Sequence, residues 1–330
     1  MPTAQVIKVE RHGDPSVLVL REAHVPHPPS GHVRIAVRAV GLNRADIGLR
    51  SGINAPSGLP SAIGYEASGV VDAVGDGVAG FSPGDRVAVL PGLNMQIYGT
   101  YAELLNYPAD MLVKIPDGQS FAEAAATWMQ YLTAYALIDP AGIRPGDDVV
   151  ITAASSSVGN AAIQIANAAG AAPIALTRRR EMVETLRRRA AAHVFVTDED
   201  GWEKKLQDRC ALPGPRIVLD AVGGRLAASL IGLIRPGGIM VSYGALADAT
   251  LPVPIAAAVA RELTLHFCSI RRLFTDPLLK SRAVSFILDG LQAGWLEPLI
   301  DRTFAFEDVV QAHRYLESGE GSGKVVLILR

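Results

Sequence analysis

Apolar and polar positions follow two different patterns along this chain, and each pattern predicts a different kind of structure. Before about residue 90 the apolar stretches are short and often alternate with polar residues, as in VRIAVRAV at 33–40, which predicts strands. Further strands are predicted at 70–74 and 86–90, and turn sequences rich in Gly, Pro and Asp lie between them. Many short strands of this kind are typical of a partly open β-barrel.

From about residue 121 the pattern becomes helical, and strands and helices then alternate. A helix is predicted over 121–138. Apolar runs at 149–154 and 173–176 flank a helix predicted over 158–169, which makes a βαβ unit of a doubly wound parallel sheet. Further strands are predicted at 194–197, 216–219, 239–243 and 263–269, helices over 278–291 and 304–316, and a closing strand at 324–329.

The turn that opens the first βαβ unit contains only small residues. It reads ASSSVG over 154–159, with serines where the dinucleotide fingerprint G-x-G-x-x-G has glycines. Amides and the dipole at a helix N-terminus attract an anion such as a pyrophosphate. We therefore expect a dinucleotide to bind at Ser155, Ser156, Ser157, Val158 and Gly159. The alternative is an ordinary tight turn of a doubly wound sheet.

Arginines follow the second strand of this unit, where an NAD site usually carries an acidic residue. The strand runs into Thr177, Arg178, Arg179 and Arg180. A guanidinium group can bind a 2′-phosphate through two hydrogen bonds, so this composition favours NADP(H), with Arg178 as the principal contact. The alternative is the exposed start of a helix, because three more arginines follow at 187–189.

Other expected site residues lie at strand ends and in one loop. Ligands of such sheets bind at the carboxyl ends of the strands, which places Val222 and Gly244 beside the dinucleotide. Cys268 lies near the end of the last predicted strand and would face the nicotinamide; it has no basic neighbour in sequence, so packing is expected rather than nucleophilic catalysis. The loop at 90–101 predicts an apolar substrate pocket with Met95 and Tyr98, or else a cover for the core.

Several motifs in a fixed order give the chain a resemblance to a known family. They include VGLNRADIGLRSG at 40–52, IGYEASGVVDAVG at 63–75, LDAVGG at 219–224 and IRPGGIMVSYG at 234–244. Together they resemble the medium-chain dehydrogenase/reductase superfamily and, within it, the zinc-independent quinone oxidoreductase branch. The resemblance implies an α/β protein with a GroES-like, partly open β-barrel at 1–121, a Rossmann NADP(H)-binding domain at 122–269, and a return to the first domain at 270–330.

The resemblance also implies a reaction site without a metal. Asn43, Tyr65 and a position near Met129 correspond to the Cys, His and Cys that hold catalytic zinc in other members, and an amide, a phenol and a thioether bind Zn²⁺ poorly. By the same resemblance Asn43 lies beside the nicotinamide ribose and the substrate; capping of the following turn is its alternative role. Tyr65 is expected either to donate to an oxyanion or to pack as an aromatic wall.

The remaining candidates lie in the motifs above or in two further motifs of the same resemblance, AAATWMQYLTAYAL at 124–137 and GKVVLIL at 323–329. Thr133 is expected at the nicotinamide end, and Trp128 and Tyr131 at the border of the substrate pocket. Lys324 is a candidate for a phosphate contact, with an exposed lysine at a strand edge as the alternative. Glu66 is expected to pair with a buried arginine, with a part in proton transfer as the alternative. Asp46 is expected to be structural, with a catalytic role as the alternative.

Length and composition fit these expectations and narrow the class of protein. The 330 residues are enough for two domains, and 31 Lys and Arg against 33 Asp and Glu give no attraction to nucleic acid or to an anionic membrane. The two cysteines do not form a disulfide framework, and neither a leader nor an apolar run of membrane-spanning length is evident, which predicts a cytoplasmic protein.

These observations predict an NADPH-dependent, zinc-independent oxidoreductase that delivers hydride to quinones or other activated C=C or C=O acceptors. Its partner is expected to be a small-molecule substrate and, by resemblance, a second copy of the chain in a homodimer. An enoyl reductase of α,β-unsaturated ketones or thioesters is the nearest alternative. A non-catalytic NADPH-binding protein, structural or sensory, is an alternative of another class.

Overall fold

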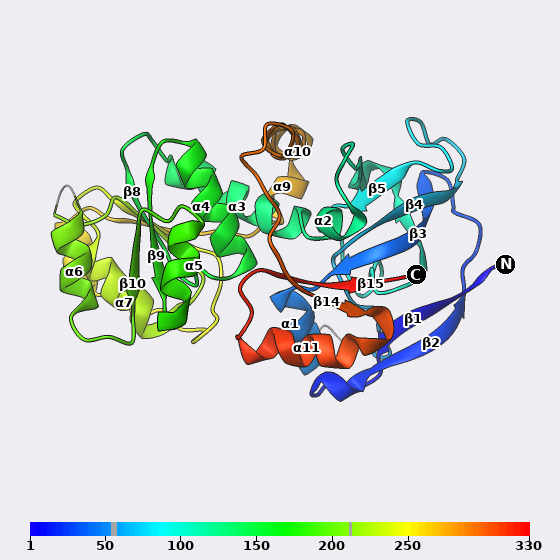
Figure 1. The fold of residues 1–330 in the computed structure, drawn as a ribbon, viewed down its shortest axis with the longest axis horizontal. Helices are drawn as coiled ribbons and strands as arrows, with labels where there is room; N and C mark the ends of the chain where they lie inside the picture. The colour runs from blue at the N-terminus through cyan, green and yellow to red at the C-terminus, as the bar shows by residue number, and fades with distance from the viewer. Residues whose placement is uncertain (54–57, 211–212) are drawn as a thin grey trace. The chain divides into compact units, whose positions relative to one another are not determined.

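The computed structural model describes residues 1–53, 58–210 and 213–330, and their contacts divide the chain into two compact units. The first unit comprises residues 1–129 and 298–330, and the second comprises residues 130–297. Figure 1 shows the elements of both units.

The first unit is built on strands that are antiparallel except for the parallel pair of β14 and β15, which confirms the prediction of a β-rich domain. Its main sheet has the order β14-β15-β3-β4-β5-β7, with β6 also paired to β3, and a separate hairpin joins β1 to β2. Along β3, Val33, Ile35 and Val37 are buried at every second position, because alternate side chains of a strand share one face. The strands are β1 (Thr3–Val9), β2 (Leu18–His24), β3 (His32–Gly41), β4 (Glu66–Val74), β5 (Arg86–Val89), β6 (Leu104–Pro108), β7 (Leu112–Lys114), β14 (Ile300–Ala305) and β15 (Lys324–Ile328).

Two predicted helices differ from those observed around this sheet. The helix predicted over 304–316 begins only at Val309, because Phe304 lies in β14 and pairs with Leu327 of β15. The helix predicted over 121–138 is two helices, α2 (Phe121–Ala125) and α3 (Trp128–Ala141). At the break the Thr127 hydroxyl donates to the Glu123 carbonyl at 2.7 Å, where a continuous helix would place the Thr127 amide. The other helices of this unit are α1 (Arg44–Ser51) and α11 (Val309–Ser318).

The second unit contains the predicted doubly wound sheet. Its six strands are all parallel, in the order β10-β9-β8-β11-β12-β13, so the strand order reverses direction at β8. The middle strands are buried on both faces, as the β-branched runs predicted. The strands are β8 (Asp148–Ile151), β9 (Ala172–Thr177), β10 (His193–Val196), β11 (Ile217–Asp220), β12 (Ile239–Ser242) and β13 (Thr264–Phe267). The helices besides α3 are α4 (Ser157–Ala168), α5 (Val183–Arg188), α6 (Trp202–Arg209), α7 (Gly224–Leu233), α8 (Ile255–Ala260), α9 (Arg272–Thr275) and α10 (Pro277–Gln292).

The chain leaves the second unit later than the sequence predicts, after residue 297 rather than after 269. Side-chain contacts explain the difference. Arg272 pairs with Asp139 of α3 at 2.6 Å, and the ring of Phe286 in α10 lies 5.1 Å from that of Tyr135 in α3. Helices α9 and α10 therefore pack within the second unit. Among the described residues, no helix combines the length and the apolar composition needed to cross a bilayer.

Candidate active site

The turn from β8 into α4 has the local geometry of a dinucleotide-binding turn. Ser156 caps the helix, and its hydroxyl accepts a hydrogen bond from the Gly159 amide at 3.1 Å. A Cβ at Gly159 would lie 2.6 Å from the Ala153 carbonyl oxygen, so only glycine lets the helix approach the strand this closely. That is the role of the third glycine in the fingerprint. Residues 155–158 are half-buried, which leaves the first turn of α4 accessible to an anion.

Asn160 holds this turn in place, and the sequence analysis did not identify it. Its side-chain amide donates to the Ser155 carbonyl at 3.3 Å and to the Ser156 carbonyl at 2.8 Å. Arg189 in turn donates to the Asn160 amide oxygen at 3.0 Å. One of the arginines that were expected only on an exposed helix therefore reaches the first turn of α4.

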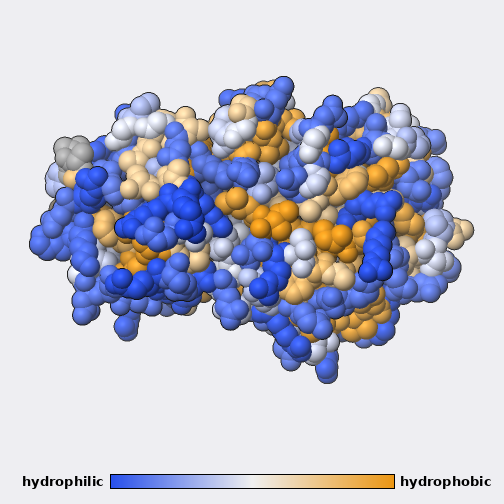
Figure 2. Space-filling model, in the orientation of Figure 1, coloured by the Kyte–Doolittle hydropathy of each residue, from blue (hydrophilic) through white to orange (hydrophobic). Residues whose placement is uncertain are grey.

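The arginines after β9 lie beside this turn, because β9 is the neighbour of β8 in the sheet. Thr177 ends the strand and is buried, and its hydroxyl accepts from the Arg179 amide at 3.1 Å. Arg178 is exposed, whereas Arg180 pairs with Glu199 at 2.6 Å. In Figure 2 strongly hydrophilic residues gather over the part of this unit where α4 and α5 are labelled in Figure 1.

A cavity of about 220 Å³ lies at the carboxyl ends of β12 and β13. Two of the residues predicted at the nicotinamide end, Thr133 and Cys268, line it together. Tyr243 also lines it, and its hydroxyl is buried with no hydrogen-bond partner among the described residues. The sequence analysis selected the adjacent Gly244 and missed Tyr243. The full lining comprises Thr133, Ala136, Leu137, Tyr243, Cys268, Ser269 and Ile270.

Cys268 and Val222 have contacts that bear on their expected roles. The Cys268 thiol donates to the Ala136 carbonyl at 3.3 Å, and burial raises the pKa of this thiol, which suits packing rather than nucleophilic attack. The Val222 amide donates to the buried Asp220 carboxylate at 3.0 Å, as does the Gly223 amide. The turn after β11 is thus shaped by Asp220, whose other contact is the Thr152 hydroxyl at 2.9 Å.

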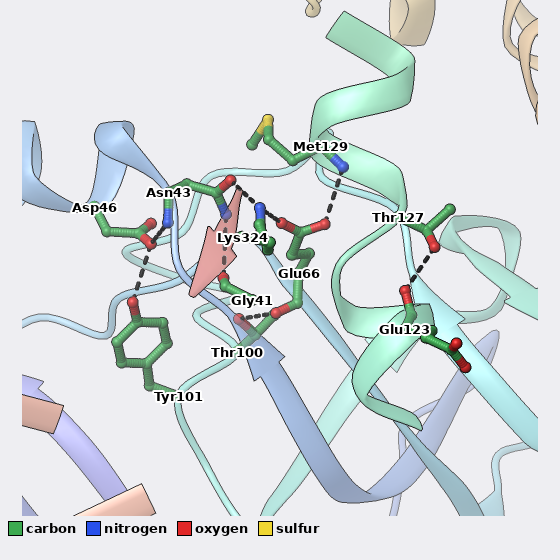
Figure 3. A network of polar contacts seen from close by, with 10 residues as sticks. All are labelled: Gly41, Asn43, Asp46, Glu66, Thr100, Tyr101, Glu123, Thr127, Met129 and Lys324. Atoms are coloured by element: carbon green, nitrogen blue, oxygen red, sulfur yellow. Dashed lines mark hydrogen bonds and ion pairs between the residues drawn. The ribbon is translucent and has the colours of Figure 1, made fainter. Parts of the chain in front are cut away.

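In the first unit, Asn43 belongs to a buried polar network (Figure 3). It is the N-cap residue of α1, and its backbone amide donates to Asp46 at 2.7 Å. Its side-chain oxygen accepts from Lys324 at 2.7 Å, and its side-chain nitrogen donates to the Gly41 carbonyl at 3.2 Å. Asn43 thus takes the N-cap position that its alternative role required, and its expected place beside the nicotinamide ribose and the substrate stays a prediction.

Lys324 corrects two expectations. It is only 1 % exposed, so it is not the exposed strand-edge lysine considered above. Its ammonium group contacts Glu66 as well as Asn43, so it is already engaged where a phosphate contact was predicted. Glu66 has the buried cationic partner that was expected, but this partner is Lys324 and not an arginine.

A second chain of buried groups runs from Asp46 to α11. The Tyr101 hydroxyl donates to the Asp46 carboxylate at 3.0 Å, and it lies 3.1 Å from Nε2 of His313. A phenol has a single proton, so Nε2 of His313 must donate to the Tyr101 oxygen. His313 Nδ1 is then an acceptor, and it has no partner among the described residues. Asp46 holds the start of α1 by accepting from the Asn43 amide, a contact that fits the structural role expected for it.

The predicted substrate-pocket residues occupy separate environments. Met95 is buried, and the ring of Tyr98 packs edge-on against that of Tyr107 at 5.6 Å. Tyr131 is also buried, and its hydroxyl donates to Gln164 of α4 at 2.8 Å. Trp128 is buried and Tyr65 half-buried. None of them lines the cavity beside Thr133, so a substrate pocket formed by these residues stays a prediction.

Metal ligands are not grouped in the part of the chain that the structure describes. No set of three or more His, Cys, Asp or Glu side chains there could hold a metal ion. Independence from zinc remains a prediction about the protein.

A GroES-like β domain and a doubly wound sheet with a dinucleotide-type turn define a pyridine-nucleotide dehydrogenase class. The chain belongs to the medium-chain dehydrogenase/reductase superfamily, as the resemblance implied. It matches the alcohol dehydrogenase GroES-like domain over residues 29–117 and the zinc-binding dehydrogenase domain over residues 191–327.

Relatives over nearly the whole chain include both quinone and enoyl reductases. Enoyl-[acyl-carrier-protein] reductase of Xenopus tropicalis mitochondria is 34 % identical over 99 % of this chain and 95 % of its own. Human quinone oxidoreductase is 30 % identical over 98 % of each chain. Among solved structures, Escherichia coli quinone oxidoreductase complexed with NADPH has a TM-score of 0.91 at 27 % identity, covering 99 % of this chain and 100 % of its own. An NAD-dependent alcohol dehydrogenase has a TM-score of 0.89 at 32 % identity with the same coverage.

The buried chain from Asp46 to His313 predicts two opposing contributions to the pH dependence of stability. Burial raises the pKa of Asp46 from 3.8 to about 7, so its contribution to folding is present below pH 3.8 and is lost as the pH rises toward 7. Burial lowers the pKa of His313 from 6.5 to about 3, so its contribution is present above pH 6.5 and is lost as the pH falls toward 3.

We therefore expect Asp46→Asn to give a free energy of unfolding that rises from pH 4 to pH 6.5, since only the His313 contribution is left. His313→Gln should give one that falls over the same range. Urea unfolding of both variants and the parent at several pH values measures this. Parallel profiles for all three proteins would contradict the assignment of these two groups.

Proposed function

We propose that this protein is an NADPH-dependent, zinc-independent reductase of quinones and other activated C=C or C=O acceptors. The observation that carries the proposal is the accessible N-terminus of α4 beside the exposed Arg178. The amides of the first turn of α4 suit a pyrophosphate, and the guanidinium of Arg178 suits a 2′-phosphate. Bound NADPH would supply the hydride.

The chain's own residues then have distinct tasks. In the second unit, Ser156 and Asn160 shape the turn that receives the pyrophosphate, and Thr133 and Tyr243 offer hydroxyl groups in the cavity at the ends of β12 and β13. In the first unit, Asn43 supplies a hydrogen-bond donor to the acceptor oxygen that gains negative charge. An amide in this position can stabilise an oxyanion but cannot act as the Lewis acid that alcohol oxidation would need.

The test is a set of acceptors offered to the purified protein. NADPH oxidation should be fastest with 9,10-phenanthrenequinone, measurable with a simple enone and absent with a simple aldehyde. A crotonyl thioester that outperforms the quinone would favour an enoyl reductase, which the similarity to the Xenopus enzyme supports as the second candidate. Tight NADPH binding with no turnover of any acceptor would favour a non-catalytic role. Stoichiometric zinc in the active protein would contradict the metal-free proposal.

The choice of NADPH over NADH is tested at Arg178. Arg178→Ala should raise the Kd for NADPH about 10- to 100-fold, because a charge-assisted contact contributes about 1.5–3 kcal/mol, and should change the Kd for NADH less than about twofold. Arg188→Ala is the matched control, because it removes another exposed arginine, at the end of α5, ten residues after Arg178. Equal effects of Arg178→Ala on both cofactors would overturn the assignment of a 2′-phosphate contact.

We also propose a homodimer formed through β13. This strand lies at the edge of the parallel sheet, and Phe267 at its end is 69 % exposed. Ile255 and Val259 of the preceding helix α8 are exposed to similar degrees. An unpaired edge with apolar neighbours is a template for a second copy. Phe267→Asp should convert dimer to monomer in sedimentation at micromolar concentration. Ile97→Asp, at a residue that is 71 % exposed in the first unit, should not. A parent protein that sediments as a monomer would refute the dimer.

A further inference from the structure

The orientation of the Asn43 side chain is set by its neighbours. A carboxamide can present either its oxygen or its NH₂ group on a given side, and in isolation the two orientations differ little in energy. For Asn43 to serve as a donor in the proposed function, the protein must select one of them.

Two independent contacts select the same orientation. Lys324 Nζ, which has only hydrogens to offer, lies 2.7 Å from Asn43 Oδ1. The Gly41 carbonyl, which can only accept, lies 3.2 Å from Asn43 Nδ2. A flipped amide would place its NH₂ against an ammonium group and its oxygen against a carbonyl oxygen. One hydrogen on Nδ2 is used by Gly41, and the structure shows no second contact of Nδ2 among the described residues.

Three adjacent strands bring this set together. Gly41, at the end of β3, pairs with Glu66 at the start of β4 and with Val326 of β15, the strand that begins at Lys324. A Cβ at Gly41 would lie 2.1 Å from the Ala125 carbonyl oxygen and 2.8 Å from Glu66 Oε1, so glycine leaves room for both the backbone of α2 and the carboxylate. Glu66 contacts Lys324 through Oε1 and accepts from the Met129 amide at 2.9 Å through Oε2 (Figure 3). The Lys324 ammonium group is therefore held between Glu66 Oε1 and Asn43 Oδ1.

We propose that Lys324 is a positioning residue: it holds the Asn43 amide so that Nδ2 donates to the acceptor oxygen that becomes negative on hydride transfer. Glu66 makes this possible, because an unpaired ammonium group with 1 % exposure would not be stable in its charged form. The proposal rests on the proposed function for the identity of the ligand, but the orientation of Asn43 itself does not depend on any ligand.

The kinetic test combines Lys324 variants with Asn43→Ala. Lys324→Met alone leaves the Glu66 carboxylate buried without a cationic partner, and this variant can fail to fold. The informative variant is therefore Lys324→Met/Glu66→Gln, which removes both charges. We expect it to lower kcat for the quinone about 10- to 100-fold, the lower part of the range for loss of one oxyanion donor, with little change in KM. Lys324→Arg, which keeps charge and donor, should restore most of kcat.

A double-mutant cycle separates positioning from a general structural effect. In the Asn43→Ala background, adding Lys324→Met/Glu66→Gln should lower kcat by less than about twofold, since the donor that Lys324 orients is already absent. A full loss of activity in that background, or no rescue by Lys324→Arg, would overturn the proposal.

A second readout needs neither cofactor nor turnover. In protein labelled with ¹⁵N at asparagine, the Asn43 side-chain amide, assigned by its absence in Asn43→Ala, should give two well-separated proton signals with slow exchange. In folded Lys324→Met/Glu66→Gln these should converge and exchange faster. Unchanged signals would overturn the positioning role, whereas inactivity with every acceptor would overturn only the proposed function.

Discussion

The buried ion pair between Lys324 and Glu66 is the constraint on which the polar interior of the first unit depends. Two charges removed from water are stable only if their remaining hydrogen-bonding groups are satisfied. Here the second carboxylate oxygen of Glu66 accepts a hydrogen bond from the Met129 amide. The Lys324 ammonium group donates one to the Asn43 side-chain oxygen. The pair therefore connects β15, the start of α3 and the start of α1. The need to compensate the buried Lys324 charge also determines which side of the Asn43 amide presents its oxygen and which presents its NH₂ group.

Asn43 links this pair to the second buried chain, since its amide donates to Asp46, and Asp46 accepts from Tyr101. The two chains solve the burial of ionisable groups differently. Lys324 and Glu66 compensate each other as opposite charges, whereas Asp46 has a raised pKa and His313 a lowered one, so both move toward their neutral forms. One polar region thus combines a buried ion pair with two groups whose pKa values are shifted toward their neutral forms.

The sequence predicted the elements more reliably than the side-chain contacts, for a physical reason. Periodicity reports which face of an element is buried, so β8, α4 and the parallel sheet could be predicted, while the end of the second unit could not, because it depends on contacts such as Arg272 with Asp139. The resemblance selected Asn43 and Lys324 as site residues, but not their mutual contact, which joins residues 281 positions apart. Asn160 was missed because it follows the turn motif at 154–159 and its contacts with that turn arise only in the folded chain. Tyr243 was missed because the sequence does not show that its side chain lines the cavity.

The two units also differ in how far their site chemistry tolerates substitution. At the start of α4 the groups proposed to bind the pyrophosphate are backbone amides, so serines can replace glycines provided that the packing contact at Gly159 is kept. At Asn43 the group proposed to act is one hydrogen of the side-chain amide. The direction of this hydrogen depends on the Lys324 ammonium group in β15 and the Gly41 carbonyl in β3. A departure from the glycine fingerprint is therefore weak evidence against nucleotide binding, whereas a change at Lys324 or Glu66 would alter the donor itself. Specificity for the acceptor is accordingly expected to depend more on the interior of the first unit than on the nucleotide turn.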